Sequence, residues 1–262
     1  MNSIIQTILQ RKSVRVYEHR LINDEIKAEI LRAAMRAPTS GNMMLYSIIE
    51  VNDQAKKNML AKTCDNQPFI ARAPLILLFL ADYQRWYDYF IACGIEKLLQ
   101  NVSMRTPAEG DLMLACCDAI IAAQTAVIAA ESFGIGSCYI GDIMENCEIH
   151  RELFNLPRYT FPICLLCFGY PSKGQIKRKQ TPRFDEQFII FKDAYHRLTS
   201  EELTEMFFQQ EHVYNNKVTK ENIENIGQQY YKRKFNSDFA IEMNRSVRAW
   251  MKSWSDSTSF IV

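Results

Sequence analysis

Residues Arg11-Lys12-Ser13-Val14-Arg15 place two guanidinium groups and one hydroxyl within a short stretch of the chain. In an extended segment Arg11, Ser13 and Arg15 share one face, because side chains two and four positions apart lie on the same side. Arginine guanidinium groups and hydroxyl groups donate hydrogen bonds that phosphate oxygens accept. The alternative is a solvated basic patch that follows a helix and interacts with the negative end of its dipole. The stretch predicts an anion site.

A turn rich in short side chains follows at Pro38-Thr39-Ser40-Gly41-Asn42. Backbone N–H groups of such a turn can hold an anion, although the same residues also end helices. The apolar residues Met43-Met44-Leu45 come next. A polar turn beside apolar side chains suits the edge of an isoalloxazine ring. Together with the arginine stretch, the turn points to the phosphate and ring of FMN.

A glycine-rich segment lies later, at Gly134-Ile135-Gly136-Ser137-Cys138-Tyr139-Ile140-Gly141. It is close to a dinucleotide fingerprint but lacks the third glycine at the required spacing and follows a predicted helix instead of a strand. A nicotinamide-binding domain of the doubly wound type is therefore not expected.

These three segments, in this order, resemble the FMN-dependent nitroreductase family, and in particular its larger, NADPH-preferring nitroreductase and flavin reductase branch. That family begins with Arg-x-Ser-x-Arg, continues with a small-residue turn that ends near an Asn, and later carries a Gly-x-Gly-x-x-x-Ile-Gly run. The segment Gly169-Tyr170-Pro171 also matches a Gly-Tyr/Trp-Pro that ends the last core strand of the family. The pair Met43-Met44 departs from the family, which often has Gln and an aromatic residue there, and this departure concerns substrate preference.

The resemblance implies FMN as the cofactor and NADPH or NADH as the co-substrate. Gln67 precedes a buried strand, where the larger branch has a flavin-contacting Gln; a loop amide without a role is the alternative. Counting back from Tyr195 places Arg183 where this branch holds the FMN phosphate, and Lys179 belongs to the same basic run. The residues expected to bind FMN are Arg11, Ser13, Arg15, Thr39, Ser40, Gly41, Asn42, Gln67, Tyr139, Ile140, Gly141, Lys179 and Arg183.

Strand and helix patterns alternate along the first two thirds of the chain and predict an α+β fold with one central sheet and helices on both faces. The resemblance implies a nitroreductase-like α/β sandwich with a mostly antiparallel sheet, in an interlocked homodimer. The predicted helices cover residues 3–10, 24–37, 54–61, 111–133 and 145–154, and the predicted strands cover residues 46–51, 74–81, 137–140 and 161–169.

Residues 1–195 are expected to form the FMN-binding core, within which the polar and aromatic region 82–110 is a lid or insert. Residues 196–262 are expected to form a helical C-terminal extension that wraps the partner subunit. Its last helix shows an apolar stripe behind a candidate N-cap at Ser237. The stripe consists of Phe239, Met243, Val247, Trp250 and Trp254.

The composition is that of an ordinary soluble protein: 262 residues, 48% hydrophobic, 23% charged, with a formal net charge of +1. Nucleic acid and membrane partners are not expected, and the apolar stretch 112–130 contains Asp118 and Gln124, which favours a buried helix. Eight cysteines without a visible secretory signal favour free thiols in the cytoplasm. Cys164 and Cys167 lie three apart in a predicted strand and point to opposite faces, which argues against a zinc site.

The four histidines show no metal spacing, and neither a nucleophile elbow nor a P-loop is present. The chemistry is therefore expected at flavin N5, without a catalytic side chain. We predict an FMN-dependent NAD(P)H oxidoreductase that reduces nitroaromatics, quinones or similar flat acceptors by a ping-pong mechanism. Basic residues of the tail, such as Arg233, favour NADPH. The alternatives are a flavin-binding protein without turnover, a flavoenzyme of the same fold that dehalogenates or degrades flavin, and an α/β protein with coincidental motifs.

Overall fold

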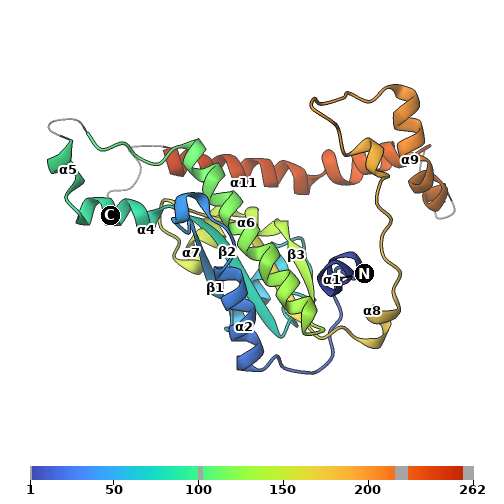
Figure 1. The fold of residues 1–262 in the computed structure, drawn as a ribbon, viewed down its shortest axis with the longest axis horizontal. Coiled ribbons are helices and arrows are strands. Elements are labelled where there is room, and N and C mark those ends of the chain that lie inside the picture. The colour runs from blue at the N-terminus through green and yellow to red at the C-terminus, as the bar shows by residue number, and fades with distance from the viewer. Residues whose placement is uncertain (1, 100–102, 216–223, 256–262) are drawn as a thin grey trace. The chain divides into compact units, whose positions relative to one another are not determined.

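The computed structural model describes residues 2–99, 103–215 and 224–255 (Figure 1). The chain forms two compact units, one of residues Met1–Arg178 with Glu242–Val262 and the other of residues Lys179–Ile241. The division within the chain falls after Arg178, and the described residues from Glu242 to Ser255 belong to the first unit.

The first unit is built on a four-stranded antiparallel sheet with the strand order β1-β2-β4-β3. All residues of β2 are buried, as its continuous apolar sequence requires. This sheet confirms the predicted α+β class and the antiparallel arrangement. The strands are β1 (Tyr46–Glu50), β2 (Leu75–Asp82), β3 (Gly136–Ile140) and β4 (Thr160–Gly169).

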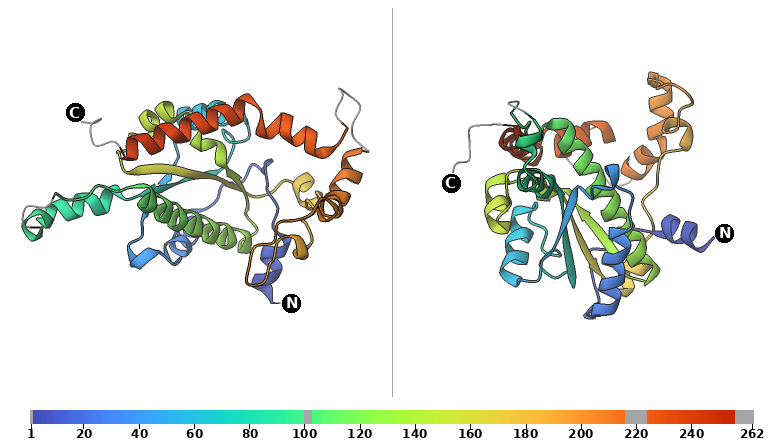
Figure 2. Two further views of the ribbon diagram at one scale, coloured as in Figure 1. Left: turned by 90° about the horizontal axis from the view of Figure 1, so that it is seen from above. Right: turned by 60° about the vertical axis from the view of Figure 1, so that its left-hand side comes forward.

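Helices cover both faces of the sheet (Figure 2). On one face α2 (Asp24–Met35) and α6 (Glu109–Ser132) enclose an alanine-rich core. On the other face α3 (Gln54–Thr63), α7 (Cys147–Phe154) and the end of α11 (Asp238–Ser255) enclose a second core. The Cys164 side chain belongs to the first core and that of Cys167 to the second, which confirms that the two thiols point to opposite faces.

The long helix α6 is the centre of the first core. By length and composition it could cross a membrane, but Ala115, Ala119 and Ala122 are fully buried and the helix packs against α2, β2 and β4. Asp111 caps its start by accepting from the Ala108 N–H at 2.9 Å. It ends before Gly134, whose φ of +70° is the left-handed conformation that favours glycine after a helix. The prediction of a buried core helix is confirmed.

Two shorter helices and a short arm complete the first unit. Asn2 and Asn23 cap α1 and α2 through their side-chain oxygens, as predicted for Asn23. Region 82–110 contains two helices that extend from the sheet as an arm (Figure 1). The remaining helices of this unit are α1 (Ser3–Gln10), α4 (Gln84–Ala92), α5 (Ile95–Leu98) and α8 (Lys173–Lys177), with the 3-10 turns η1 (Ser40–Asn42) and η2 (Gly141–Met144).

The end of α11 closes the second core. Trp250 and Trp254 are 1% and 2% exposed, with ring centroids 5.7 Å from Phe161 and 5.8 Å from Tyr159. These two tryptophans of the predicted stripe therefore cover the core of their own chain and need no partner to be buried.

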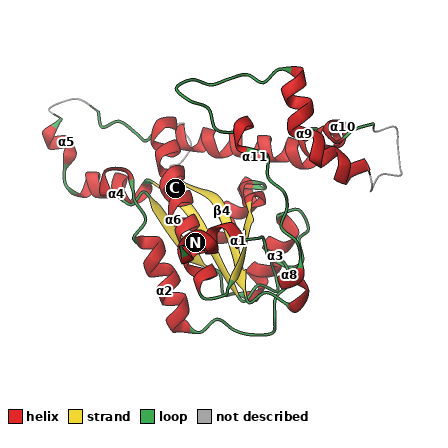
Figure 3. Cartoon of the chain, turned by 45° about the vertical axis from the view of Figure 1, so that its right-hand side comes forward, coloured by secondary structure: helices red, strands yellow, loops and turns green. Residues whose placement is uncertain are grey.

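The second unit is helical, as the sequence pattern predicted (Figure 3). Ser237 lies before α11, and its hydroxyl accepts from the Ala240 N–H at 3.3 Å, in the N-cap geometry expected from the sequence. The elements of this unit are η3 (Glu186–Phe188), α9 (Ser200–Asn215), α10 (Ile226–Tyr230), the π-helical turn η4 (Tyr231–Phe235) and the first residues of α11.

Candidate functional site

The segment 11–15 lies against the outer edge of β3. The Val14 N–H donates to the Ser137 carbonyl at 2.8 Å, and Ser13 pairs with Ser137 in a parallel bridge. Gly136 makes this approach possible, because any Cβ at that position would overlap the side chain of Val14. A backbone hydrogen bond and a β-bridge thus join the first and third sequence motifs. Position 136 is a glycine because a larger residue would overlap Val14.

Arg11, Ser13 and Arg15 meet around the thiol of Cys138 on β3. Burial raises the pKa of this thiol, while the charges of Arg15 and Arg11 and hydrogen bonds from Arg15 and Ser13 act in the opposite direction. Arg15 also lies over the Phe69 ring, with its Cζ 5.9 Å from the ring centroid. The three predicted phosphate and flavin ligands therefore form one electropositive group at a sheet edge.

The segment 175–178 supports this group from the other side. Arg178 donates through Nη2 to the Ser13 carbonyl, and Lys12 Nζ donates to the carbonyls of Ile176 and Arg178 at 2.6 and 2.8 Å. The Arg15 N–H donates to Gln175 Oε1 at 3.2 Å. Arg178 therefore adds a third guanidinium beside the Arg11–Arg15 segment.

The backbone of Tyr139 faces the same outer edge of β3. Alternate residues of an antiparallel strand direct their backbone groups to opposite neighbours, so Tyr139 shares the outward direction of Ser137. The Tyr139 hydroxyl donates to Gln124 Oε1 on α6 at 3.3 Å, and burial raises its pKa. The side chain of Ile140 is buried in the second core, and Gly141 begins η2. The predicted Tyr139–Gly141 segment thus adjoins the arginine group.

Gln67 lies beside the end of this segment. Its Nε2 donates to the Cys64 carbonyl and to Asp142 Oδ2, both at 3.0 Å. Because Asp142 directly follows Gly141, these bonds bring the predicted glutamine next to the predicted glycine. Both bonds use the amide nitrogen, which leaves Oε1 as the atom of Gln67 that can accept from a ligand.

The turn Thr39–Asn42 is fixed by Asp118 of α6, which is 2% exposed. Asp118 Oδ1 accepts from the Ser40 N–H and hydroxyl at 2.9 and 3.0 Å, and Oδ2 accepts from the Leu45 N–H at 3.1 Å. Thr39 Oγ1 accepts from the Met44 N–H at 2.8 Å. Gly41 and Asn42 both have positive φ, and both are exposed at the tip of the turn.

Within one chain the turn and the arginine group are held at two places along α6. Asp118 anchors the turn, and Gln124, which binds Tyr139, lies six residues further on. Six residues of α-helix correspond to about 9 Å along the axis. Because Asp118 is buried and Gln124 is exposed, the two predicted halves of the flavin site are held from different faces of the same helix.

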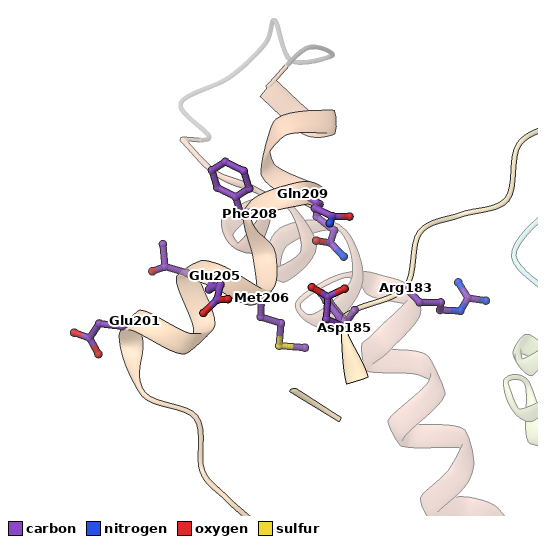
Figure 4. Close-up of a pocket in the computed structure, with 10 residues that line it drawn as sticks. Arg183, Asp185, Glu201, Glu205, Met206, Phe208 and Gln209 are labelled. Atoms are coloured by element: carbon purple, nitrogen blue, oxygen red, sulfur yellow. The ribbon is translucent and has the colours of Figure 1, made fainter. Parts of the chain in front are cut away.

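Lys179 and Arg183 lie in the second unit. Arg183 lines a pocket of about 530 Å³ together with Asp185 and residues of α9. Figure 4 shows its guanidinium extending away from Glu201 and Glu205. The structure thus places Arg178 of the basic run beside the Arg11–Arg15 segment, and leaves the predicted phosphate contacts of Lys179 and Arg183 as predictions.

The donors at the edge of β3 fit FMN. The cofactor carries a phosphate, a hydroxylated chain and a flat ring with polar edges, and it requires cations, hydroxyl groups and outward-facing backbone groups. Arg11 and Arg178 supply guanidinium forks, Ser13 supplies a hydroxyl, and Tyr139 supplies backbone groups at an open strand edge. Among the described residues no group of His, Cys, Asp and Glu is arranged to hold a metal ion.

Three supporting residues were not identified as functional from the sequence. Asp118 was recognisable as the one carboxylate within the apolar stretch 112–130, a pattern that indicates a buried anchor. Arg178 belonged to a basic run in which nothing distinguished it. Asp142 follows the last glycine of the third motif and carried no signal, because its partner Gln67 is 75 residues away in the chain.

Comparison with known proteins assigns this arrangement to a class of flavin-binding α+β proteins. Residues 8–170 match the Nitroreductase family, and the chain belongs to that family. It is 33% identical over 197 residues to FMN reductase (NADPH) of Bacillus subtilis (strain 168), covering 74% of this chain and 75% of the relative. It is 31% identical over 204 residues to FMN reductase [NAD(P)H] of the same organism, covering 78% of each. The crystal structure of nitroreductase A from Vibrio parahaemolyticus RIMD 2210633 is 25% identical and superimposes with a TM-score of 0.79, covering 96% of this chain and 98% of that one.

Proposed function

We propose that this protein is a homodimeric FMN enzyme that takes electrons from NADPH or NADH and passes them to nitroaromatics, quinones or similar flat acceptors. Its family membership makes it a flavin-dependent NAD(P)H oxidoreductase. The observation that carries the proposal is the meeting of Arg11, Ser13 and Arg15 at the outer edge of β3 in a chain of this family.

Bound FMN supplies hydride chemistry at its N5 position, and one bound flavin can serve a donor and then an acceptor in turn. Arg11 and Arg178 would hold the phosphate by charge-assisted hydrogen bonds. Arg15, which lies over the Phe69 ring, would bring its charge next to the flavin ring. A positive charge at that position stabilises negative charge on the reduced cofactor. Backbone groups of Tyr139 and Gly141 would orient the polar edge of the ring, and no side chain would be required to transfer a proton.

The names of two relatives, FMN reductase (NADPH) and FMN reductase [NAD(P)H], support a nicotinamide electron donor. The basic segment Lys232-Arg233-Lys234 lies in the second unit, in the turn η4. Arginine can hold a phosphate bidentately, so this segment favours NADPH over NADH as the donor.

A second copy of the chain accounts for the apolar surface of α1 and α6. These helices contact one another, and eight of their apolar side chains are more than a third exposed, which is unusual for two adjoining helices of a monomer. We define the α1–α6 apolar surface as Ile4, Ile5, Ile8, Leu9, Met113, Leu114, Ile120 and Ile121. In a dimer formed there, the turn Thr39–Asn42 of one subunit lies close to the arginine group of the other and completes two equivalent sites.

Free thiols favour a reducing compartment, and we therefore propose the cytoplasm as the location of this protein. All eight cysteines are free, and five of them are buried, as expected of small core residues in a reducing environment.

The test begins with the purified protein and its Arg15→Ala variant. The wild type is expected to be yellow, to retain FMN after dialysis and to oxidise NADPH when a quinone or nitroaromatic is added. Loss of one charge-assisted contact should weaken FMN binding in Arg15→Ala by about ten- to a hundredfold. A colourless wild-type protein that binds no added FMN would refute the proposal. A yellow protein without NAD(P)H oxidation would identify a flavin-binding protein without turnover, and halide release or flavin breakdown would identify another reaction of the same fold.

A further inference from the structure

A second cationic cavity lies on the α3 side of the sheet. It has a volume of about 690 Å³ and is enclosed by residues 15–21, the first turns of α3 and residues 71–74, which precede β2. Four basic side chains line it, namely Arg15, Arg20, Lys57 and Arg72, together with His19 and a single carboxylate, Glu18. Of the predicted flavin ligands, Arg15 lines this cavity, whereas Ser13, Gln67 and Tyr139 do not.

Lys57 lines the cavity and is only 8% exposed. Its Nζ donates to the Ala73 carbonyl at 3.2 Å, so a second wall residue fixes the position of the ammonium. Burial lowers the pKa of Lys57. An ammonium has three donors, and a buried charge with one neutral acceptor is costly unless an anion compensates it.

In the part of the chain that the structure describes, no carboxylate forms an ion pair with the cations of the cavity, Arg15, Arg20, Lys57 and Arg72. The acidic residue with an influence on Lys57 is Glu50, whose Oε1 already accepts from Lys27 Nζ at 2.9 Å. The positive charge of the cavity therefore remains for a ligand.

The walls of the cavity are held in place. Arg20 lies over the Tyr170 ring, with its Cζ 3.8 Å from the ring centroid. Gln54 Nε2 donates to the Ala71 carbonyl at 3.0 Å, which ties the first turn of α3 to the wall that carries Arg72. Guanidinium groups that line one cavity with a buried ammonium suit a multiply charged, tetrahedral anion better than a single carboxylate.

We propose that this cavity is a second anion site, distinct from the flavin site, which binds a small organic phosphate with its phosphoryl group between Lys57 and Arg72. The volume is that of a site for a small molecule, about 300–1,000 Å³, and exceeds what one inorganic phosphate fills. Arg15 belongs to both sites, so a bound phosphate would alter the charge next to the flavin. The site itself needs no flavin, and its failure would not affect the proposed function.

The experiment uses the FMN-loaded protein, titrated by calorimetry with inorganic pyrophosphate and, separately, with ADP. Flavin absorbance is followed throughout, so that displacement of FMN is distinguished from binding at a second site. We expect saturable binding with one ligand per chain while FMN stays bound. Equal affinity for both ligands identifies free phosphates as the source, and tighter binding of ADP identifies a nucleotide; either result supports the site.

The matched variants are Lys57→Met and Lys56→Gln. Lys56 neighbours Lys57 on α3, but its Nζ donates to the Leu153 carbonyl at 2.8 Å and faces the Phe154 ring, away from the cavity. Lys57→Met is expected to weaken pyrophosphate binding at least about tenfold, while Lys56→Gln binds as the wild type does. If Lys57→Met fails to fold, the affinity of Arg72→Gln for pyrophosphate is measured instead, because Arg72 is exposed. Absence of saturable binding to the wild type, or unchanged affinity in both cavity variants, would overturn the proposal.

Discussion

Asp118 and Ser40, 78 residues apart, are joined by two hydrogen bonds to a single carboxylate oxygen: Oδ1 accepts from the Ser40 N–H at 2.9 Å and from its hydroxyl at 3.0 Å. The other oxygen accepts from the Leu45 N–H. Asp118 is 2% exposed and lies in the alanine-rich helix α6. This buried carboxylate therefore sets the conformation of a surface turn in which Gly41 and Asn42 have positive φ. The shape of the turn depends on the core and not only on its own sequence.

Asp118→Asn is expected to loosen this turn. The amide keeps one acceptor oxygen but places an NH₂ group against a backbone N–H, which leaves buried donors without acceptors and costs about 1–3 kcal/mol. Thermal unfolding should show a melting temperature several degrees lower. Glu109→Gln, an exposed change in the first turn of the same helix, is the control and should melt as the wild type does. Equal melting temperatures for both variants would show that Asp118 does not anchor the turn.

Gly136→Ala is expected to displace the arginine segment, because a methyl group there overlaps Val14. The Val14–Ser137 hydrogen bond should lengthen, and with it the positions of Arg11 and Arg15 should change, so that FMN is lost on dialysis. Gly174→Ala in α8 is the matched change, since a Cβ at that position meets no atom within 4 Å. FMN content per chain, read from visible absorbance, checks both. Full retention of FMN in Gly136→Ala would separate this contact from flavin binding.

Much of the fold was predictable because its elements are signalled locally. The helix Ser3–Gln10, the N-cap at Asn23, the uninterrupted apolar strands β2 and β4 and the stop at Gly134 each follow from neighbouring residues. The joining of segments 11–15 and 136–141 was not predictable from either segment alone, since it depends on the small volume of Gly136 and on strand order. Only the resemblance to the nitroreductase family indicated that these two segments belong to the same site.

The supporting contacts were harder to predict for the same reason. Asp142 binds Gln67, and Arg178 binds Ser13, across long separations in the chain, and neither residue type is unusual in its local sequence. The stripe on α11 was read correctly as apolar and helical. Two of its residues, Trp250 and Trp254, pack on the chain's own Tyr159 and Phe161, a contact that no local pattern distinguishes from a subunit interface. The wrapping of the partner subunit by residues 196–262 stays a prediction.

Stability is expected to fall as the pH rises from about 5 to about 8, because of Glu145. Burial, and then the neighbouring carboxylates of Asp142, Asp65 and Glu242, raise the pKa of Glu145 from 4.5 to about 7. Between these values the folded protein binds more protons than the unfolded chain. The stabilisation is therefore complete below pH 4.5 and is lost as the pH passes 7. Glu131, whose pKa burial also raises to about 7, acts with the same sign.

Glu145→Gln tests the contribution of that one group. The variant cannot ionise at this position, and its NH₂ group faces carboxylates, so it should melt at a higher temperature than the wild type at about pH 8 and the difference should shrink toward about pH 5. Glu152→Gln on α7, an exposed glutamate, should show no such trend. A difference between Glu145→Gln and the wild type that does not depend on pH would assign the effect to packing instead of ionisation.

Ile121→Glu is expected to break the proposed dimer. Ile121 is 39% exposed on α6 and belongs to the α1–α6 apolar surface, so a carboxylate there would be buried without a partner when a second copy docks, at a cost of several kcal/mol. Light scattering should show a dimer for the wild type and a monomer for the variant, and FMN should be lost together with the dimer because each site takes its turn Thr39–Asn42 from the other subunit. Met59→Glu is the matched control, an apolar side chain of similar exposure, 41%, on α3 at the opposite face of the sheet. It should remain dimeric and yellow. A wild type that is monomeric and retains FMN, or an Ile121→Glu variant that stays dimeric, would show that this surface is not where the two copies meet.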